Sequence, residues 1–349
     1  MRKLKNMNVL QIKPKQITKK LMETLPERAS TVVISRYGLG SDSKRMTLEA
    51  IGQNYGITRE RVRQIENYAL NKIKQSGLIE KERKIFDELL SAIDSLGGVV
   101  HEGHLFEYLS TKEDERNHIH LLLVLGDEFT KEKEDEHFSP RWYIDKYLAD
   151  KVHGALLKLR DEISEDDLIS EEQILKSFSK LVSDIPKKYV SDNETLKRWL
   201  MISKNIGKNQ LGEWGLSSSS NINAKGMRDY AYLIIRQHGS PMHFAEVTRK
   251  IGEIFNKKAH IATCHNELIK DPRFVLVGRG LYALKEWGYM VGVVKDVIHQ
   301  MLEQNGPMTK DEIIENVLKE RYVKENTIIV NLQDPKCFKK TKDGKYILI

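Results

Sequence analysis

The stretch from residue 56 to residue 66 reads Gly56-Ile57-Thr58-Arg59-Glu60-Arg61-Val62-Arg63-Gln64-Ile65-Glu66. The hydroxyl of Thr58, directly after a glycine-bearing turn, predicts the start of a helix because it can accept a hydrogen bond from the first turn. Apolar residues then recur every three or four positions, at Val62, Ile65, Ala69 and Ile73. This spacing predicts a helix with one buried face that runs to about Gly77.

A second, shorter helix is predicted just upstream, over residues 46–55. Thr47 is a candidate cap, Leu48 and Ile51 form an apolar pair, and Gly56 follows the last turn. Two helices joined by a short turn predict a helix-turn-helix, whose second helix enters the major groove of DNA. The polar arc of that second helix suits base edges, because Arg pairs with guanine, Gln or Asn with adenine, and Glu with cytosine.

These residues resemble the fourth conserved region of bacterial primary sigma factors. The resemblance covers roughly residues 25–75 and includes Arg36-Tyr37-Gly38-Leu39 and Thr47-Leu48-Glu49 besides residues 56–66. It implies that the chain reads a promoter element like the −35 element in double-stranded DNA and contacts the β flap of core RNA polymerase. It implies base contacts from Arg59, Glu60, Arg63 and Gln64. It implies contacts to the DNA backbone from Thr47, Arg61, Asn67 and Lys72. Tyr68 departs from the pattern, because such sigma factors often have Lys there.

Charge is distributed unevenly along the 349 residues. Residues 1–84 hold 19 Lys and Arg against 8 Asp and Glu, a balance of +11, whereas the whole chain carries +7 and the other 265 residues therefore −4. A positive field of this kind attracts the phosphate backbone. Residues 1–24 mix lysines with apolar residues, which predicts either a short helix packed on the helix-turn-helix or a basic arm. No apolar run approaches the ~18 residues of a membrane span, so we expect a cytoplasmic, nucleoid-associated protein without membrane contact.

A repeat follows the helix-turn-helix, after a single helix expected over residues 78–95. Three helices and a glycine-turned hairpin recur over residues 225–289 and 290–349, which predicts two winged helices, and weaker copies are expected over residues 85–148 and 149–224. Aromatic residues near the expected wing tips recur about every 65 to 70 positions, at residues 142, 214, 282 and 346. We therefore expect a mainly α protein with small β wings, in which a helix-turn-helix domain over residues 1–84 precedes tandem winged-helix modules.

Residues 212–289 also resemble the HARE-type helix-turn-helix domain, as found in the δ subunit of bacterial RNA polymerase. The resemblance rests on Gly239 to Met242, the segment Gly280 to Leu284, and Trp287. It implies a winged helix that takes part in DNA transactions, with DNA or a protein as its ligand. The third helix of this copy carries a possible second binding surface, made of Lys257, Lys258, His260, His265 and Asn266. For the other copies we expect protein contacts.

We expect no catalytic residues, no metal and no cofactor. Residues 101–104 with His118 and His120 lack the spacing of a zinc site, and we interpret these histidines as solvated loop residues. His260, Cys264 and His265 are interpreted as a core cysteine beside surface histidines, and the acidic run over residues 131–136 as a solvated loop. No phosphate-binding loop, nucleophile elbow or dinucleotide fingerprint occurs.

The sequence thus predicts a non-enzymatic, sequence-specific DNA-binding transcription protein that associates with RNA polymerase. One alternative is a DNA-targeting module of a restriction or defence system, whose catalytic partner is a separate protein. Another is an assembly scaffold, in which acidic winged helices bind proteins and the basic end anchors to nucleic acid.

Overall fold

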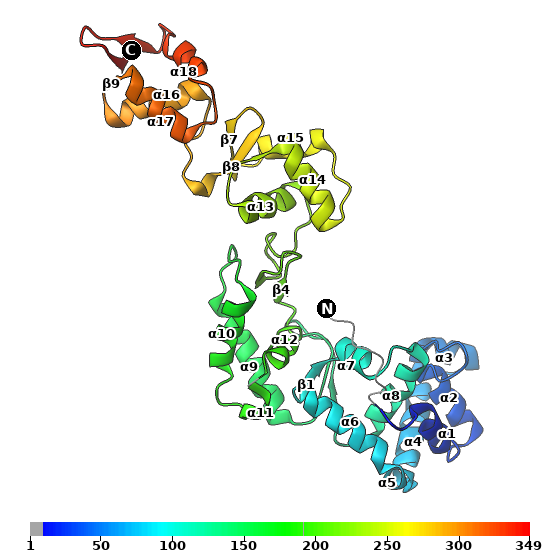
Figure 1. Ribbon diagram of the computed structural model, residues 1–349. Helices are drawn as coiled ribbons and strands as arrows, with labels where there is room; N and C mark the ends of the chain where they lie inside the picture. Colours follow the sequence, from blue (N-terminus) through cyan, green and yellow to red (C-terminus); the bar gives the residue numbers. More distant parts are fainter. Residues whose placement is uncertain (1–9, 191) are drawn as a thin grey trace. The chain divides into compact units, whose positions relative to one another are not determined.

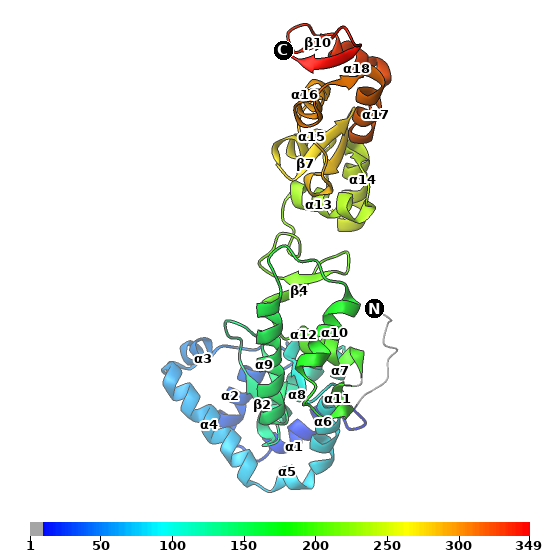
Figure 2. The same ribbon diagram turned by 90° about the vertical axis from the view of Figure 1, so that its left-hand side faces the viewer.

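A computed structural model describes residues 10–190 and 192–349 of the chain. The chain divides into two compact units (Figure 1 and Figure 2). Unit 1 comprises residues up to 208 together with residues 214–217, and unit 2 comprises residues 209–213 and 218–349. The architecture is the predicted one, mainly α-helical with small antiparallel sheets. The boundaries of the five proposed modules remain a prediction from the sequence.

Unit 1 begins with four helices, of which the third and fourth were predicted with nearly their observed limits. They are α1 (Pro14–Met22), α2 (Glu27–Tyr37), α3 (Leu48–Tyr55) and α4 (Arg59–Gln75). Thr47 caps α3 and Thr58 caps α4, each accepting a hydrogen bond from a backbone amide in the first turn. Helix α1 agrees with the first reading of residues 1–24, a helix packed on this unit. The part of that expectation that concerns residues 1–9 lies outside the described residues.

The next elements build a three-stranded sheet flanked by helices. They are α5 (Leu78–Lys81), α6 (Arg83–Ser95), β1 (Val99–His101), α7 (Glu102–Leu109), α8 (Glu113–Leu125), β2 (Thr130–Glu132) and β3 (Arg141–Tyr143). The strands lie in the order β1-β3-β2, all antiparallel. The prediction of one helix over residues 78–95 was wrong, because the backbone leaves helical geometry at Glu82, with φ −102° and ψ 23°.

Helix α8 is buried on almost all sides. It packs against α1, α2 and α4 as well as α6 and α7, and its consecutive leucines at positions 121–123 are all fully buried. Asn117 on this helix donates hydrogen bonds to the carbonyls of Gly38 (2.9 Å) and Ser43 (2.8 Å), which follow α2. The helix-turn-helix and the first sheet module therefore share one hydrophobic core.

The histidines near this sheet are not solvated loop residues, as the sequence suggested. His101 caps α7, whereas His118 and His120 lie on α8. His118 is 5% exposed and hydrogen-bonds Thr18 Oγ1 at 2.6 Å. His120 packs among Tyr37, Phe106 and Trp142, and burial lowers the pKa of its imidazole to about 2. These rings are part of the core because α8 is covered from several sides.

A second helical module completes unit 1. Its elements are α9 (Lys146–Glu162), α10 (Glu171–Leu181), α11 (Lys187–Val190), α12 (Asn193–Leu200), β4 (Ile206–Lys208) and β5 (Trp214–Leu216). Ile169 forms an isolated antiparallel bridge to Trp214, so β5 lies between this bridge and β4. The arrangement parallels the first sheet, in which the last strand is also the middle one.

Unit 2 contains two further modules of the same plan. The first has α13 (Met227–His238), β6 (Met242–His243), α14 (Phe244–Phe255), α15 (Ile261–Lys270), β7 (Phe274–Gly278), β8 (Leu281–Leu284) and a 3-10 turn (Lys285–Trp287). The second has α16 (Val294–Asn305), β9 (Met308–Thr309), α17 (Lys310–Glu320), α18 (Glu325–Leu332), β10 (Phe338–Lys340) and β11 (Lys345–Leu348). The sheets have the orders β6-β8-β7 and β9-β11-β10.

The recurring aromatic residues do not lie at wing tips. Trp142, Tyr282 and Tyr346 each lie on the central strand of a three-stranded sheet, and Trp214 lies on β5, between β4 and the Ile169 bridge. Trp142, Tyr282 and Trp214 are only 1%, 2% and 5% exposed. Tyr346 is half-buried and packs against the core of its module, so the regular spacing reflects a similar strand position in each module with different degrees of burial.

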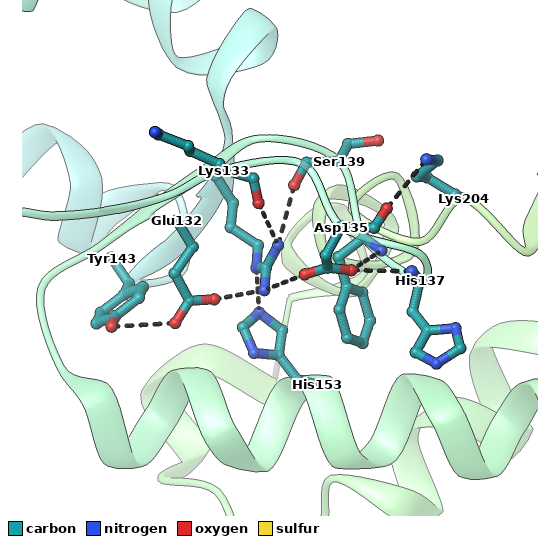
Figure 3. A network of polar contacts seen from close by, with 10 residues as sticks. Glu132, Lys133, Asp135, His137, Ser139, Tyr143, His153 and Lys204 are labelled. Carbon is teal, nitrogen blue, oxygen red and sulfur yellow. Dashed lines mark hydrogen bonds and ion pairs between the residues drawn. The ribbon is translucent and has the colours of Figure 1, made fainter.

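A buried arginine, Arg141, joins the first sheet to the second module, and its partners Glu132, Asp135 and His153 are labelled in Figure 3. The guanidinium of Arg141, on a residue that is 4% exposed, forms ion pairs with Glu132 and Asp135 and donates Nε–H to His153 of α9 at 2.8 Å. It also donates to the carbonyls of Lys133 and Ser139. The acidic run over residues 131–136 is therefore more than a solvated loop, because two of its carboxylates neutralise a buried cation.

The loop between β2 and β3 is held against the second module by further contacts. Lys204, which lies beside this loop in Figure 3, donates its amide to the carbonyl of His137 at 2.8 Å. Its Nζ pairs with Glu134 at 2.6 Å. The amide of Ser139 donates to Ile202 at 2.9 Å. The loop between β2 and β3, which is the first wing, is consequently held by contacts within unit 1.

We predict that this network makes unit 1 sensitive to acid. Burial, and secondarily the charge of Arg141, lower the pKa of His153 to about 4 from an ordinary 6.5. The unfolded chain therefore binds the additional proton between pH 6.5 and 4, and the stability that depends on neutral His153 is present above pH 6.5 and is lost as pH falls through this range. Urea unfolding of His153→Gln, which keeps a hydrogen-bond acceptor, should show a weaker pH dependence there. Identical pH profiles for the variant and the unmodified protein would contradict this assignment.

Candidate nucleic-acid interface

Helices α3 and α4 meet at a tight turn that depends on two glycines. Gly56 ends α3 in the left-handed region, with φ +63°, a conformation that glycine adopts without strain. Gly52 faces the turn itself: the amide of Ile57 donates to its carbonyl at 3.0 Å. A Cβ at position 52 would lie 2.6 Å from the carbonyl oxygen of Ile57. The close approach of α3 to α4 therefore requires the absence of a side chain.

A small apolar core sets the orientation of α4. Val32, Ile51 and Val62 come from α2, α3 and α4, and they are 2%, 0% and 0% exposed. Ile57 and Ile65 pack around them. Since Val62 and Ile65 point into this core, the side chains on the opposite arc of α4 point away from the protein.

The predicted base-contacting residues all lie on that exposed arc. Arg59, Glu60, Arg63 and Gln64 are solvent-exposed. So are three of the predicted backbone-contacting residues, Thr47, Arg61 and Asn67, whereas Lys72 is half-buried with its Nζ 3.4 Å from Tyr68 Oη. The structure thus brings the reading residues together in the first two turns of α4.

The side chains of the exposed arc are paired with one another. Arg63 donates from Nε and Nη2 to the two oxygens of Glu60, at 2.9 and 2.6 Å, and Arg61 donates to the Oε1 of Gln64 at 3.0 Å. The hydrogen bond lowers the pKa of Glu60 and raises the pKa of Arg63. Both groups therefore remain charged.

The Arg63–Glu60 ion pair can be replaced by contacts to DNA at a small cost in free energy. Arg63 and Glu60 are more than half exposed, so water competes with their interaction. A guanine edge or a phosphate offers Arg63 the same bidentate acceptor geometry as the carboxylate. The arrangement can therefore present either a cation or an acceptor to a ligand.

Two residues outside the predicted site fix α4 to α2. Arg36 on α2 pairs with Glu66 on α4 at 3.4 Å, where the side chain of Glu66 is 12% exposed, and Arg36 donates to the carbonyl of Met46 at 3.1 Å. Both positions fall within the segment of the sigma-factor resemblance. Sequence periodicity did not reveal this pairing, since it depends on how α2 and α4 cross.

A shallow hollow lies beside the turn, at the amino end of α4. It is lined by residues of both helices: Glu49, Gly52, Gln53, Gly56, Ile57, Thr58 and Arg61. The first amides of a helix attract anions. The hollow therefore places Arg61 and the start of α4 around a space that an anionic group could approach.

The second predicted surface, on the module around α15, is weaker in charge. Lys257, Lys258, His260 and Asn266 are exposed, but His265 is half-buried and stacks on Phe244 with 4.3 Å between ring centroids. Lys257, Lys258 and His260 precede α15, whereas exposed Ile261 and Ile269 lie on it, at 53% and 62% exposure. The assignment of this surface to DNA or protein remains a prediction.

The described residues contain no metal-binding cluster and no membrane-spanning helix. Among them, no three His, Cys, Asp or Glu side chains lie close enough to hold an ion together. Cys264 is fully buried, where burial raises the pKa of its thiol, and Cys337 is half-buried. No helix in the described ranges is long and apolar enough to cross a bilayer.

We predict opposite effects of alanine at two helical glycines. Gly52→Ala should destabilise the protein by about 1 to 3 kcal/mol, because its methyl group overlaps the carbonyl of Ile57. Gly154→Ala in α9 is the matched control: a Cβ there meets nothing within 4 Å, so the better helix former should stabilise by about 0.5 to 1 kcal/mol. Urea unfolding followed by circular dichroism measures both. A stabilising Gly52→Ala would show that α3 and α4 are not in this close contact.

Comparisons with known proteins show what the helix-turn-helix segment is similar to. Residues 21–75 match the family model described as Sigma-70, region 4. The RNA polymerase sigma factor RpoD of Neisseria gonorrhoeae is 35% identical over 72 residues, which cover 21% of this chain and 11% of that protein. The RNA polymerase sigma factor SigA of a Bacillus species is 46% identical over 54 residues, which cover 16% of this chain and 14% of that protein.

The similarity is confined to one segment. The chain covers less than one sixth of the length of either sigma factor, and the matched family model ends at residue 75, where α4 ends. The match contains the whole of α2, α3 and α4 with the turn between them. Residues 21–75 of this chain are thus similar to region 4 of the sigma-70 family.

Proposed function

We propose that the chain is a sequence-specific DNA-binding transcription protein that reads a promoter element like the −35 element with α4. The observation that carries the proposal is the exposed arc of Arg59, Glu60, Arg63 and Gln64, held on a rigid two-helix frame within the segment that matches sigma-70 region 4. Binding rather than catalysis is the proposed role, because the arc offers hydrogen-bond donors and acceptors for base edges.

The geometry supports insertion into the major groove. The apolar core of α2, α3 and α4 supports the reading helix from behind, and the four side chains occupy its first two turns, the part of a recognition helix that contacts bases. Thr47, at the start of α3, and Arg61, in the first turn of α4, are also exposed and accessible to phosphates. The balance of +11 over residues 1–84 supplies long-range attraction to the backbone.

Association with RNA polymerase is part of the proposal, and rests on the similarity to sigma factors. By analogy with region 4, we propose the β flap of the core enzyme as the partner. The contact between α8 and the back of the helix-turn-helix leaves the reading face open. A complex with polymerase and DNA together is therefore compatible with unit 1 as it stands.

A second candidate function is a targeting or scaffold module of a restriction or defence system. Exposed Ile261 and Ile269 on α15 favour protein contacts in unit 2 over DNA contacts. In that case α4 would bring a separate catalytic protein to DNA. Copurification with an endonuclease or methylase, and not with polymerase, would favour this alternative.

The decisive experiment is selection of bound duplexes from a random pool, with and without core RNA polymerase. Arg63→Ala and Gln64→Ala should each weaken binding to the selected site by roughly 5- to 150-fold and relax base preference at one position. Gln75→Ala, an exposed glutamine at the far end of α4, is the matched control and should bind normally. Unchanged binding of both test variants would show that this arc does not read DNA.

A further inference from the structure

The hairpin of β10 and β11 concentrates positive charge at the carboxyl end of the chain. Residues 335–349 contain five lysines and one acidic residue, Asp343. All five lysines are solvent-exposed: Lys336, Lys339, Lys340, Lys342 and Lys345. By contrast, residues 290–334 of the same module contain eight Asp and Glu against five Lys and Arg. The module is therefore polarised, with a basic hairpin and an acidic helical body.

These lysines are not committed to partners within the described part of the chain. None of the ion pairs among the described residues involves them, whereas Lys295 and Lys319 of the helical body pair with Asp334 and Glu315. Lys340 Nζ lies 6.0 Å from the centroid of the Tyr346 ring. Their charges are thus available to an external anion.

The other three hairpins differ from this one. The first wing is held by the Arg141 network, and in the second, Lys208 pairs with Glu171. In the third, Gly278 forms a bridge to Tyr322, and Arg279 is the single cation of its turn. Only the last of the four hairpins that the structure describes combines several exposed cations with none of these internal contacts.

The backbone of the hairpin distributes its charges over both faces and the tip. Lys339 pairs with Ile347 and Lys340 with Tyr346 across the antiparallel strands, and successive strand residues point to opposite faces. Lys342 lies in the turn, which is closed by hydrogen bonds between Thr341 and Lys345 at 2.7 and 3.1 Å. A narrow element with cations on two faces fits between two rows of anions better than against a flat surface.

We propose that this lysine hairpin is a second, sequence-independent DNA contact, in which its lysines bind the phosphates that border a groove of the duplex. Lysine is a flexible point charge suited to phosphate without base discrimination. The phosphates of the two strands that border a groove form two rows of anions, which match the cations on the two faces of the hairpin. The choice of DNA as the polyanion rests on the proposed function, since α4 would bring DNA to the same protein.

The test uses the full chain and a 30-base-pair duplex of scrambled sequence, with affinity measured between 50 and 200 mM salt. The slope of log affinity against log salt is negative, and the double variant Lys340→Gln with Lys342→Gln should make it shallower by roughly 1.8, because each phosphate contact contributes about −0.9. At about 100 mM salt the affinity for the duplex should fall at least fivefold, which is less than the full loss of affinity expected from two phosphate contacts. Lys310→Gln with Lys319→Gln removes the same charge from exposed positions of α17 and should change the slope little.

Three outcomes would overturn the proposal. The first is an unchanged salt slope, and the second is an equal change of slope in the two double variants. The third is that Lys340→Gln with Lys342→Gln loses affinity for phosphatidylserine vesicles, measured in parallel, but keeps its affinity for the duplex. Circular dichroism melting confirms that both double variants fold. Repeating the series in Arg63→Ala with Gln64→Ala separates the two proposals. If α4 does not read bases, selectivity between the selected and scrambled duplexes is unaffected by those substitutions, while the hairpin still alters the salt slope. If the hairpin does not bind DNA, the α4 substitutions reduce selectivity between the two duplexes, and the hairpin substitutions leave the salt slope unchanged.

Discussion

The inner face of α4 is the feature on which the arrangement of unit 1 depends. Near its amino end, Val62 packs with Val32 and Ile51 in the small core of the helix-turn-helix. Two turns further on, Ala69 and Ile73 enter the large core that also contains residues of α6 and α8. One helix thus connects both cores, and its exposed arc is oriented by contacts along its length. Burial of this kind contributes on the order of 25 cal/mol per Å² of apolar surface.

Polar contacts give this apolar packing its specificity. Asn117 satisfies two carbonyls beyond α2 and accepts from Arg45 Nε at 2.6 Å. The buried guanidinium of Arg141 has acceptors on every side, including two carboxylates and His153. A buried cation without such partners would cost several kcal/mol. These groups therefore select one arrangement of the loops around the cores, where apolar packing alone would tolerate several.

The four sheet modules share one topology but use their surfaces differently. In the first module, α8 and the loop between β2 and β3 are both engaged in contacts within unit 1. The last module instead leaves its hairpin free and strongly basic. Repetition of a fold therefore does not imply repetition of a role, because contacts to neighbouring elements decide which surfaces remain accessible.

Sequence alone determined the local structure: the caps at Thr47 and Thr58, the turn at Gly56, the arc of α4 and the strands of the unit 2 hairpins all follow from short-range spacing. Such features depend on backbone conformation and periodicity within a few residues. What only the tertiary structure decided are the pairings between distant residues. The break at Glu82, the burial of His118 and His120, the ion pairs of Arg141 and the central-strand position of the aromatic residues fall into this group. The spacing of these residues in the sequence does not predict such contacts, since each contact depends on which helix or strand covers the residue after folding. A charged run such as residues 131–136 has the same sequence pattern whether it binds a buried cation or water.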